Sequence, residues 1–568
     1  VAHAVLKEKQ LLITDTTFRD AHQSLIATRM RTQDMLGITD LYEERLKNLF
    51  SVECWGGATF DVALRFLKED PWERLEKLRE QMPSALLQML FRGSNALGYT
   101  NYPDNVLRRF IQLSAQSGID VFRIFDALNW IENMRVSIDE VLKSGKICEA
   151  SICYSGDLSS PAEKKYTLEY YLKMAQKLEK MGVHFLAIKD MAGLCKPKAA
   201  KILFKELKKN IKIPIHFHTH DTSGNGVATL LNASDAGVDI VDVAIDSWSG
   251  FTSQPSFGAV LESLDGNNRD PKISSAVVRT AANYWEGVRK QYQPFESKTR
   301  TSMSEVYLHQ MPGGQYTNLR EQARSMGITD ERWPELASMY AEVNKIFGDV
   351  IKVTPISKVV GDMAIYMLAN NIQIEDVLDP KKDVGFPASV IEFFSGRLGQ
   401  PYKGFPKALQ KKILKGKKPI NYRFGSKLPS LKIKNRTKEL EKNYNEIISE
   451  KDTISQIFFP EVFDEYMKHK KKFGNTSVIP TSNYFFGMNT DEEIYVSIEP
   501  GKTLIIRYFT LSEPNEKGFR TVYFELNGQA RSVDIKDNSI AVDDLAKEIA
   551  DPSNKDHVAA PIPGLLVD

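Results

Sequence analysis

The repeated order of strand and helix is the feature that most constrains how this chain folds. From residue 11 to about residue 245, short apolar runs typical of buried strands alternate with stretches whose apolar residues recur at helical spacing. Few folds other than the TIM barrel repeat a strand and a helix eight times within about 250 residues. We therefore predict an α/β fold, a TIM (β/α)8 barrel, followed by further domains. The predicted strands are residues 11–14, 50–54, 86–90, 121–125, 150–154, 184–188, 213–217 and 240–244.

Length and composition favour a soluble protein of several domains. The chain has 568 residues, 42% of them hydrophobic and 26% charged, with a net charge of only +2. No apolar run approaches the roughly 20 residues that span a bilayer, so we expect no membrane insertion. The basic runs at 407–418 and 468–472 contain no interleaved aromatic residues, which argues against nucleic-acid binding. The cysteines form no CxxC pair and no targeting signal precedes the first strand, so we expect free thiols and a cytoplasmic location.

Two histidines stand together at the end of the seventh predicted strand. His218 and His220 are two residues apart, and side chains at that spacing on a strand point the same way. Active sites of barrels lie at the carboxyl ends of the strands, where such a pair suits a metal ion. The alternative is that both are ordinary core histidines. His216 belongs to the same row but lies deeper, and for it we favour a hydrogen-bonded core histidine.

Polar residues also follow other predicted strands. Asp20 follows the first strand, Asp61 the second, Arg92 the third and Lys189 the sixth. Each has a structural alternative. It is a helix N-cap for Asp20, a turn for Asp61, a surface position for Arg92 and a side chain that reaches solvent for Lys189. Because these strand ends meet at one rim of a barrel, the carboxylates, amine and arginine join the two imidazoles. Together they predict a site for a hard or borderline metal ion.

The pattern changes twice beyond the barrel. Residues 274–473 have a mainly helical pattern, within which Thr354 before Pro355 predicts a helix N-cap followed by proline at the first helical position. Residues 493–537 alternate like strands, and the Asn527-Gly528 pair is a strong hairpin signal. We therefore expect a helical extension and then a small antiparallel β unit.

Four motifs carry a family resemblance that extends over nearly the whole chain. They are TDTTFRDAHQ at 14–23, ECWGGATFD at 53–61, IKDMAG at 188–193 and HTHDTSGN at 218–225. These motifs resemble the carboxyltransferase domains of the pyruvate carboxylase family. Related barrels are the carboxyltransferase subunits of oxaloacetate decarboxylase and of transcarboxylase. The β unit at 493–537 resembles part of the family's tetramerisation and allosteric domain, and residues 557–564 resemble the first strand of a biotinyl carrier domain.

The resemblance also implies the domain organisation. The barrel with the carboxyltransferase site is expected at 1–273, and a helical extension that completes the active-site mouth at 274–473. A partial β tetramerisation and allosteric domain is expected at 474–545. Residues 546–568 are expected to be a linker and the start of a truncated biotinyl carrier domain.

The activity implied by the resemblance is transfer of CO2 from carboxybiotin to pyruvate, which forms oxaloacetate through a metal-stabilised enolate. The implied cofactor is a divalent metal, zinc or manganese, held by Asp20, His218, His220 and a carboxylated Lys189. Carboxylation makes chemical sense because an ammonium cannot ligate a cation, whereas a carbamate offers anionic oxygen.

The resemblance implies roles for the remaining site residues as well. Arg92 would clamp the pyruvate carboxylate with its planar guanidinium, which lysine could not copy. Arg19 and Gln23 would bind the keto oxygen, and Thr354, over the barrel mouth, would pass a proton to biotin. The biotin pocket is expected to include Asp61, Tyr99, Ser357 and Lys358.

The expected partners follow from the same resemblance. The chain contains no Met-Lys-Met sequence, so biotin would be supplied by a biotinyl carrier domain that is not in this chain. A biotin carboxylase domain and a homo-oligomer, dimer or tetramer, are also expected. The nearest rival is an oxaloacetate decarboxylase or transcarboxylase subunit, against which the β unit and the carrier-like tail weigh. A non-catalytic assembly module would be expected to have lost its ligand residues, but all the motif positions are occupied. A biotin-independent lyase of the wider superfamily is a further alternative, and a test for biotin dependence would separate it.

Overall fold

The computed structural model describes residues 1–296, 301–499, 501–515 and 517–538. Contacts within the chain divide it into two compact units, Val1–Ser477 and a second that begins at Val478. The finer boundaries given above stay a prediction. The predicted linker and carrier-like strand at 546–568 lie outside the described residues.

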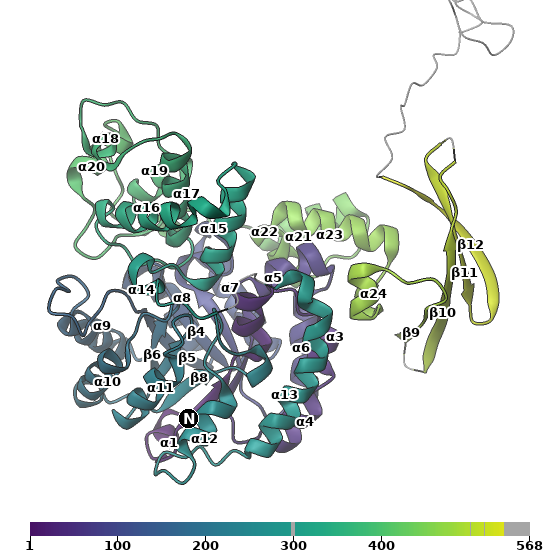
Figure 1. Ribbon diagram of the computed structural model, residues 1–568, viewed down its shortest axis with the longest axis horizontal. Coiled ribbons are helices and arrows are strands. Elements are labelled where there is room, and N and C mark those ends of the chain that lie inside the picture. The colour runs from purple at the N-terminus through teal and green to yellow at the C-terminus, as the bar shows by residue number, and fades with distance from the viewer. Residues whose placement is uncertain (297–300, 500, 516, 539–568) are drawn as a thin grey trace, which may run out of the picture. The chain divides into compact units, whose positions relative to one another are not determined.

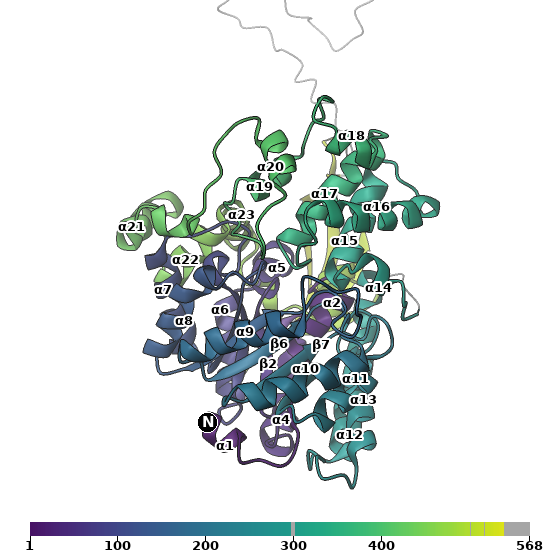
Figure 2. The ribbon, with the colours of Figure 1, turned by 90° about the vertical axis from the view of Figure 1, so that its left-hand side faces the viewer.

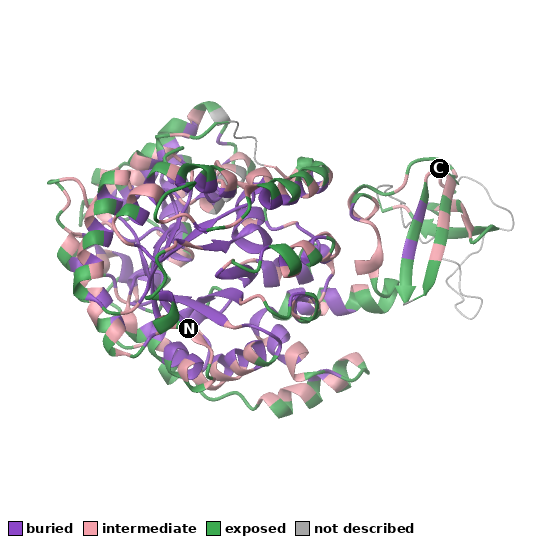
Figure 3. Ribbon diagram, turned by 90° about the horizontal axis from the view of Figure 1, so that it is seen from below, coloured by how far each residue is buried: buried purple, intermediate pink, exposed green. Residues whose placement is uncertain are grey.

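Eight parallel strands close into a barrel, which confirms the predicted fold (Figure 1). Each strand pairs with its successor and β8 pairs with β1, with Leu12 opposite Ile240. Apart from Leu12 and Ile147, every residue of these strands is buried, which explains their nearly continuous apolar sequence (Figure 3). The strands are β1 Leu12–Asp15, β2 Ser51–Gly56, β3 Leu87–Arg92, β4 Val121–Phe125, β5 Ile147–Cys153, β6 Phe185–Asp190, β7 Ile215–Thr219 and β8 Ile240–Val243.

Helices connect the strands and cover the outside of the barrel (Figures 1 and 2). Their starts follow local rules: the side chain of Asp70 accepts the backbone N–H of Trp72 at 2.8 Å, with Pro71 in the first turn of α6. The helices are α1 Ala2–Val5, α2 His22–Leu25, α3 Thr32–Leu36, α4 Thr39–Arg45, α5 Thr59–Val62, α6 Pro71–Gln81, α7 Asp104–Gln116, α8 Ile131–Lys143, α9 Leu168–Lys180, α10 Pro197–Asn210, α11 Gly226–Asp235 and α12 Phe257–Leu264, with short turns η1 Thr17–Ala21, η2 Ala63–Leu67, η3 Gly93–Asn95 and η4 Asp246–Trp248.

The extension after the barrel is helical, as predicted. Its longer helices include α16 Trp333–Ile346 and α17 Ile356–Ala369, which are joined by the segment that carries Thr354. The other elements are α13 Ser275–Arg289, η5 Lys290–Phe295, α14 Val306–His309, α15 Gly313–Ser325, η6 Asp330–Arg332, α18 Ile374–Leu378, α19 Ala388–Phe394, α20 Lys407–Leu414, η7 Phe424–Lys427, α21 Ile433–Tyr444, α22 Glu450–Phe458 and α23 Pro460–Phe473.

The start of α17 differs from the prediction. Pro355, not Thr354, occupies the N-cap position, and the helix begins at Ile356 without a side-chain cap. The backbone carbonyl of Val353 accepts the N–H of Ile356 at 2.8 Å and that of Ser357 at 3.1 Å. Because a carbonyl fixes this first turn, the hydroxyl of Thr354 is not used as a cap. The Thr354–Pro355 peptide is cis.

The second unit contains the predicted antiparallel β sheet. Its strands are β9 Glu493–Glu499, β10 Lys502–Leu511, β11 Phe519–Leu526 and β12 Gln529–Lys536, in the order β12-β11-β10-β9. Helix α24 Thr481–Phe486 precedes them, and η8 Thr476–Val478 spans the division between the units. Asn527 and Gly528 form the two-residue loop between β11 and β12 with φ of 49° and 79°, which confirms the hairpin.

The inside of the barrel holds a layer of buried charges. Arg123 on β4 forms ion pairs with Glu149 on β5 and with Asp242 on β8, and all three side chains are inaccessible to solvent. His216 lies between the same two carboxylates, with its ring nitrogens 2.6 Å from an oxygen of Glu149 and 2.6 Å from an oxygen of Asp242. The prediction of a hydrogen-bonded core histidine is therefore confirmed. Burial alone would lower the pKa of His216, but the two carboxylates outweigh burial and raise it.

Replacing Arg123 by Met should destabilise the barrel strongly. The change keeps much of the side-chain volume but removes the guanidinium that pairs with both buried carboxylates, which costs about 3–5 kcal/mol of unfolding free energy. The matched control is Arg135→Met on α8, where a half-exposed arginine pairs with Glu132 at 2.8 Å; that change should cost less than about 1 kcal/mol. Urea unfolding followed by circular dichroism measures both. Equal stability of the two variants would contradict a central role for the charged layer.

Candidate metal centre and active-site cavity

Three ligand atoms converge at the mouth of the barrel. Asp20 comes from η1, His218 from the end of β7 and His220 from the residue after that strand. All three are buried, and one atom from each lies within 4.8 Å of the others. The Nε2 atoms of His218 and His220 are 3.1 Å apart, and they lie 3.1 Å and 3.4 Å from Oδ2 of Asp20. The structure thus brings the two predicted histidines and the predicted carboxylate together.

The opposite nitrogen of each imidazole has its own acceptor. Nδ1 of His218 lies 2.5 Å from Oδ2 of Asp242, and Nδ1 of His220 lies 2.6 Å from the carbonyl oxygen of Thr252. Both acceptors need a proton on Nδ1, so the Nε2 atoms carry lone pairs. The amide nitrogen of Gln254, 3.3 Å from Nε2 of His220, is a donor that suits this tautomer.

This arrangement fits a cation. Two imidazole lone pairs and a carboxylate oxygen meet with no donor hydrogen among them. In the described part of the chain, Oδ2 of Asp20 is buried without a hydrogen bond, although Arg19 approaches it to 3.0 Å. Burial opposes ionisation of Asp20, yet the charge of Arg19 opposes burial, and the pKa of Asp20 is held well below its usual range. Nitrogen and carboxylate donors together suit zinc and similar divalent metals.

Lys189 lies beside this cluster. It is opposite His218 in the β6–β7 ladder, and only 4% of the residue is exposed, so the solvent-reaching alternative is wrong. Its ammonium lies 5.6 Å from the centre of the Phe125 ring and forms no hydrogen bond or ion pair with the residues that the structure describes. Burial lowers the pKa of Lys189, against the opposing charge of Asp20.

Arg19 and Gln23 line the wall next to Asp20. One nitrogen of Arg19 donates to both carboxylate oxygens of Glu53, at 2.8 Å and 2.9 Å, and another lies 3.4 Å from the amide oxygen of Gln23. The same oxygen of Gln23 accepts the N–H of Ala58 at 3.1 Å. Gly57 has a φ of 56° and comes so close that a β-carbon there would lie 2.8 Å from this oxygen. The turn at Gly56 and Gly57 therefore lets the backbone approach Gln23 this closely, and the N–H of Ala58 holds the Gln23 side chain in place.

A cavity of about 390 Å³ opens onto these residues. Arg92 on β3 faces it and is 8% exposed, so the surface alternative is wrong. One nitrogen of Arg92 donates to the carbonyls of Leu97 and Gly98, at 2.9 Å and 2.8 Å, which leaves the rest of the guanidinium free of hydrogen bonds to the described residues. The predicted site residues that line the cavity are Arg19, Asp20, Gln23, Asp61, Arg92, Tyr99, Lys189, His220 and Thr354.

Two of the predicted biotin-pocket residues do not reach this cavity. Ser357 is fully buried in α17, and Lys358 is exposed and pairs with Asp362 at 2.6 Å; neither is among the described residues that line the cavity. Asp61, which does line it, forms an ion pair with Arg65 at 3.1 Å. Burial raises the pKa of Asp61 despite that arginine.

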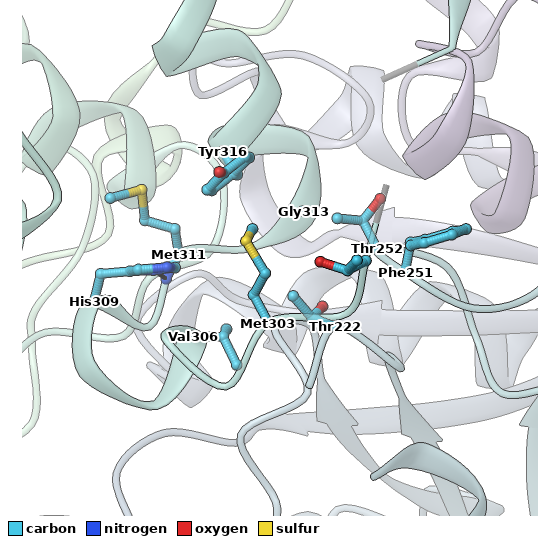
Figure 4. Close-up of a pocket in the computed structure, with 10 residues that line it drawn as sticks. Thr222, Phe251, Thr252, Met303, Val306, His309, Met311, Gly313 and Tyr316 are labelled. Carbon is cyan, nitrogen blue, oxygen red and sulfur yellow. Dashed lines mark hydrogen bonds between the residues drawn. The ribbon is translucent and has the colours of Figure 1, made fainter. Parts of the chain in front are cut away.

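A second, much smaller cavity of about 10 Å³ lies between Thr252 and the segment after the barrel. Met303, Met311 and Tyr316 gather around it (Figure 4). A space of this size holds one water molecule at most. Of these two cavities at the barrel mouth, only the larger one has room for a substrate.

The sequence analysis does not identify the groups that orient Arg19 and the two histidines. Glu53, Asp242 and the carbonyl of Thr252 hold Arg19, His218 and His220 respectively. For Glu53 and Asp242 a signal exists, because each is a carboxylate inside an otherwise apolar strand. A backbone carbonyl leaves no such signal.

The fold and the site together define a TIM-barrel protein with a buried centre suited to a divalent metal. Family models match two parts of the chain: "HMGL-like" at residues 114–248 and "Conserved carboxylase domain" at residues 306–507. The solved carboxyl transferase domain of Rhizobium etli pyruvate carboxylase is 52% identical, with a TM-score of 0.93 over 94% of this chain and 90% of that chain. The chain belongs to the pyruvate carboxylase family and corresponds to its carboxyltransferase region.

Longer relatives show how much of the family's architecture this chain covers. The pyruvate carboxylase of Bacillus subtilis (strain 168) is 51% identical over 567 residues, which are 100% of this chain and 49% of the relative. The complete multifunctional pyruvate carboxylase of Rhizobium etli aligns over 95% of this chain and 53% of its own, with a TM-score of 0.93. The chain thus spans about half the length of these relatives. Among the described residues, no helix has both the length and the apolar character needed to cross a membrane.

Replacing His218 or His220 by Ala should reduce the bound divalent metal without unfolding the barrel. Each change removes one of the converging nitrogens, and the remaining donors have poorer geometry. The control is His3→Ala, since His3 is exposed at the start of the chain. Elemental analysis after dialysis against zinc or manganese measures the metal, and circular dichroism checks the fold. Full metal content in a folded double variant would refute the site.

Proposed function

We propose that this chain catalyses the carboxyltransferase half-reaction of pyruvate carboxylase, which moves a carboxyl group from carboxybiotin to pyruvate and forms oxaloacetate. One observation carries the proposal. The metal-type cluster, formed by Asp20, His218 and His220, meets Arg92 and Thr354 at a single cavity large enough for pyruvate and the biotin ring. The similar Rhizobium etli domain, 52% identical, has been solved with pyruvate and biocytin. The pyruvate carboxylases reported above also favour this family member over a decarboxylase or transcarboxylase subunit.

The metal would be held by Asp20, His218 and His220, with Lys189 as a fourth ligand once it is carboxylated; zinc and manganese both suit these donors. When bound, a divalent cation supplies Lewis acidity for negative charge that develops on a substrate oxygen. Lys189 would acquire ligand oxygens when its neutral amine adds CO2 and releases a proton. The carbamate then carries the negative charge that an ammonium lacks.

Arg92 would bind the pyruvate carboxylate. The guanidinium nitrogen that is not bound to the carbonyls of Leu97 and Gly98 is available to an anion, and the fork geometry of arginine matches a carboxylate. Arg19 and Gln23, held by Glu53 and the N–H of Ala58, would face the keto oxygen. Charge that grows on this oxygen as the methyl group loses a proton is stabilised by the buried guanidinium of Arg19.

Thr354 would carry the proton. Carboxybiotin releases CO2 and leaves a basic nitrogen, which takes the hydroxyl proton of Thr354 while that hydroxyl takes a proton from the pyruvate methyl group. The resulting enolate attacks CO2 to give oxaloacetate. In the described part of the chain the hydroxyl of Thr354 has no hydrogen bond, so it is free for this exchange. Asp61 and Tyr99 would flank the biotin ring, whereas Ser357 and Lys358 have weaker support because they do not line the cavity.

The full reaction would need partners beyond this chain. A biotinyl carrier domain would bring carboxybiotin to the cavity, and a biotin carboxylase domain would charge it. We also infer a homo-oligomer and a cytoplasmic location.

The proposed function is tested by decarboxylation of oxaloacetate in the presence of free biotin, with pyruvate followed through a coupled NADH assay. We expect pyruvate release that depends on both biotin and a bound divalent metal. Release that is independent of biotin would indicate a lyase of the wider superfamily. No release by a metal-loaded protein would contradict the carboxyltransferase and favour the assembly module.

Replacing Arg92 by Lys should weaken catalysis with pyruvate. Lysine keeps the positive charge but loses the fork, and a charged hydrogen bond contributes roughly 1.5–3 kcal/mol, so kcat/KM should fall about tenfold to a hundredfold. The control is Arg135→Lys, a half-exposed arginine on α8. Steady-state kinetics over a range of pyruvate or oxaloacetate concentrations measures the change, and wild-type kinetics in R92K would refute the clamp.

Replacing Thr354 by Ala should abolish proton transfer and leave binding intact. Loss of a positioned proton carrier lowers turnover by about a hundredfold or more, while metal content and the KM for oxaloacetate stay near wild type. Thr354→Ser keeps the hydroxyl and should retain most of the activity. Exchange of pyruvate methyl protons with solvent, followed by NMR with biotin present, reports the step directly. Wild-type exchange in T354A would mean that another group moves the proton.

A further inference from the structure

The segment that carries Thr354 is a connection without regular structure. It joins α16 to α17 over residues 347–355, and its last part, Val353 and Thr354, lines the active-site cavity. The helices on either side belong to the extension, whereas the substrate residues Arg92 and Arg19 belong to the barrel. The position of the hydroxyl relative to the substrate therefore depends on what ties this segment to the barrel.

Two residues of the barrel hold the start of this segment. The ammonium of Lys165, in the loop between β5 and α9, donates to the carbonyl of Gly348 at 2.6 Å and to that of Asp349 at 2.9 Å. The hydroxyl of Tyr166, which is 1% exposed, donates to the same carbonyl of Asp349 at 2.7 Å. All three bonds go to backbone oxygens, so they fix the path of the chain itself.

Among the described residues, the carbonyls of Gly348 and Asp349 are the only hydrogen-bond partners of the Lys165 ammonium. Lys165 also forms no ion pair in the described part of the chain, and its half-buried ammonium is directed to the two carbonyls. The pKa of Lys165 is lowered to about 8 by burial, despite the opposing charge of Asp349. An exposed lysine would keep its full hydration at no cost. A lysine that gives up part of that hydration to bind a loop is expected to matter for the loop's position.

The segment is braced internally as well, so a displacement at its start is passed along it. The side chain of Asn344 donates to Oδ1 of Asp349 at 2.8 Å and accepts the N–H of Val350 at 3.1 Å. The fully buried Lys352 donates to the carbonyl of Val350 at 3.1 Å. These bonds connect the anchored carbonyls of Gly348 and Asp349 to the residues just before Thr354.

The same barrel loop holds a second part of the extension. The ammonium of Lys403 donates to the carbonyl of Lys164 at 2.9 Å, and the ring of Tyr402 lies 4.6 Å from that of Tyr170 at the start of α9. Residues 164–170 are thus a docking point for the extension on the barrel. From this geometry we infer that Lys165 and Tyr166 are positioning residues that set the place of the Thr354 hydroxyl over the barrel mouth. This inference rests on the proposed proton-transfer role of Thr354.

The first test is Lys165→Met, which keeps the aliphatic stem and removes the hydrogen-bond donors. In the biotin-dependent decarboxylation of oxaloacetate we expect kcat to fall about tenfold to a hundredfold, as for a catalytic group displaced by about an ångström, with metal content and the KM for oxaloacetate unchanged. Lys165→Arg should recover part of kcat because it restores donors. Tyr166→Phe removes a single bond, should lower kcat less, and serves if K165M folds poorly. Lys173→Met, an exposed lysine on α9 that pairs with Glu169, is the matched control and should keep wild-type kinetics.

A double-mutant cycle with Thr354→Ala decides whether Lys165 acts through Thr354. We expect K165M to lower kcat in the wild-type background and to have no further effect in the T354A background. Additive losses, or wild-type kcat in both K165M and Y166F, would overturn the inference while leaving the role of Thr354 intact. Wild-type turnover in T354A would instead overturn the role of Thr354, and the inference with it.

Discussion

The buried ion pairs of Arg123 constrain the rest of the site. Asp242 is shared: its two oxygens accept from Arg123 and His216, and one of them also accepts from Nδ1 of His218. A carboxylate held on several sides cannot turn away from His218. The imidazole is thereby fixed in orientation and tautomer, with Nε2 directed at Asp20. A metal-type cluster at the mouth thus depends on charges one layer deeper in the barrel, where most barrels pack aliphatic side chains.

The site is built from two parts of the chain that do different work. The barrel supplies the ligand cluster, Arg19 and Arg92 on its strands or on the segments that directly follow them, so these groups keep their spacing around the cavity. The extension supplies Thr354 on an irregular connection. In the proposed mechanism Thr354 transfers a proton, a step more sensitive to distance than charge stabilisation, so the anchors that Lys165 and Tyr166 provide would matter for it.

Sequence reasoning found the barrel and the metal cluster because both follow from periodicity. Each predicted strand is marked by an apolar run. Side chains on a strand repeat with a period of two residues, which places His218 and His220 on one face. The sequence analysis assigns no role to Arg123, Asp242 or Glu53, although a charge inside a buried strand is itself a signal that the barrel interior is polar. Other features could not be found. The carbonyl of Thr252 has no sequence mark, the first turn of α17 is set by the carbonyl of Val353, and the helix phase that turns Ser357 and Lys358 from the cavity depends on tertiary packing.

The central claim is that the lone pairs of His218 and His220 and the carboxylate of Asp20 jointly hold one divalent metal ion. Anomalous X-ray diffraction from crystals of the zinc-loaded or manganese-loaded protein tests it most directly, with data collected on both sides of the metal's absorption edge. The account predicts one strong anomalous peak within about 2.0–2.2 Å of both Nε2 atoms and of an oxygen of Asp20, with the Lys189 side chain directed at it. No peak there, or a peak bound only by surface residues, would contradict it.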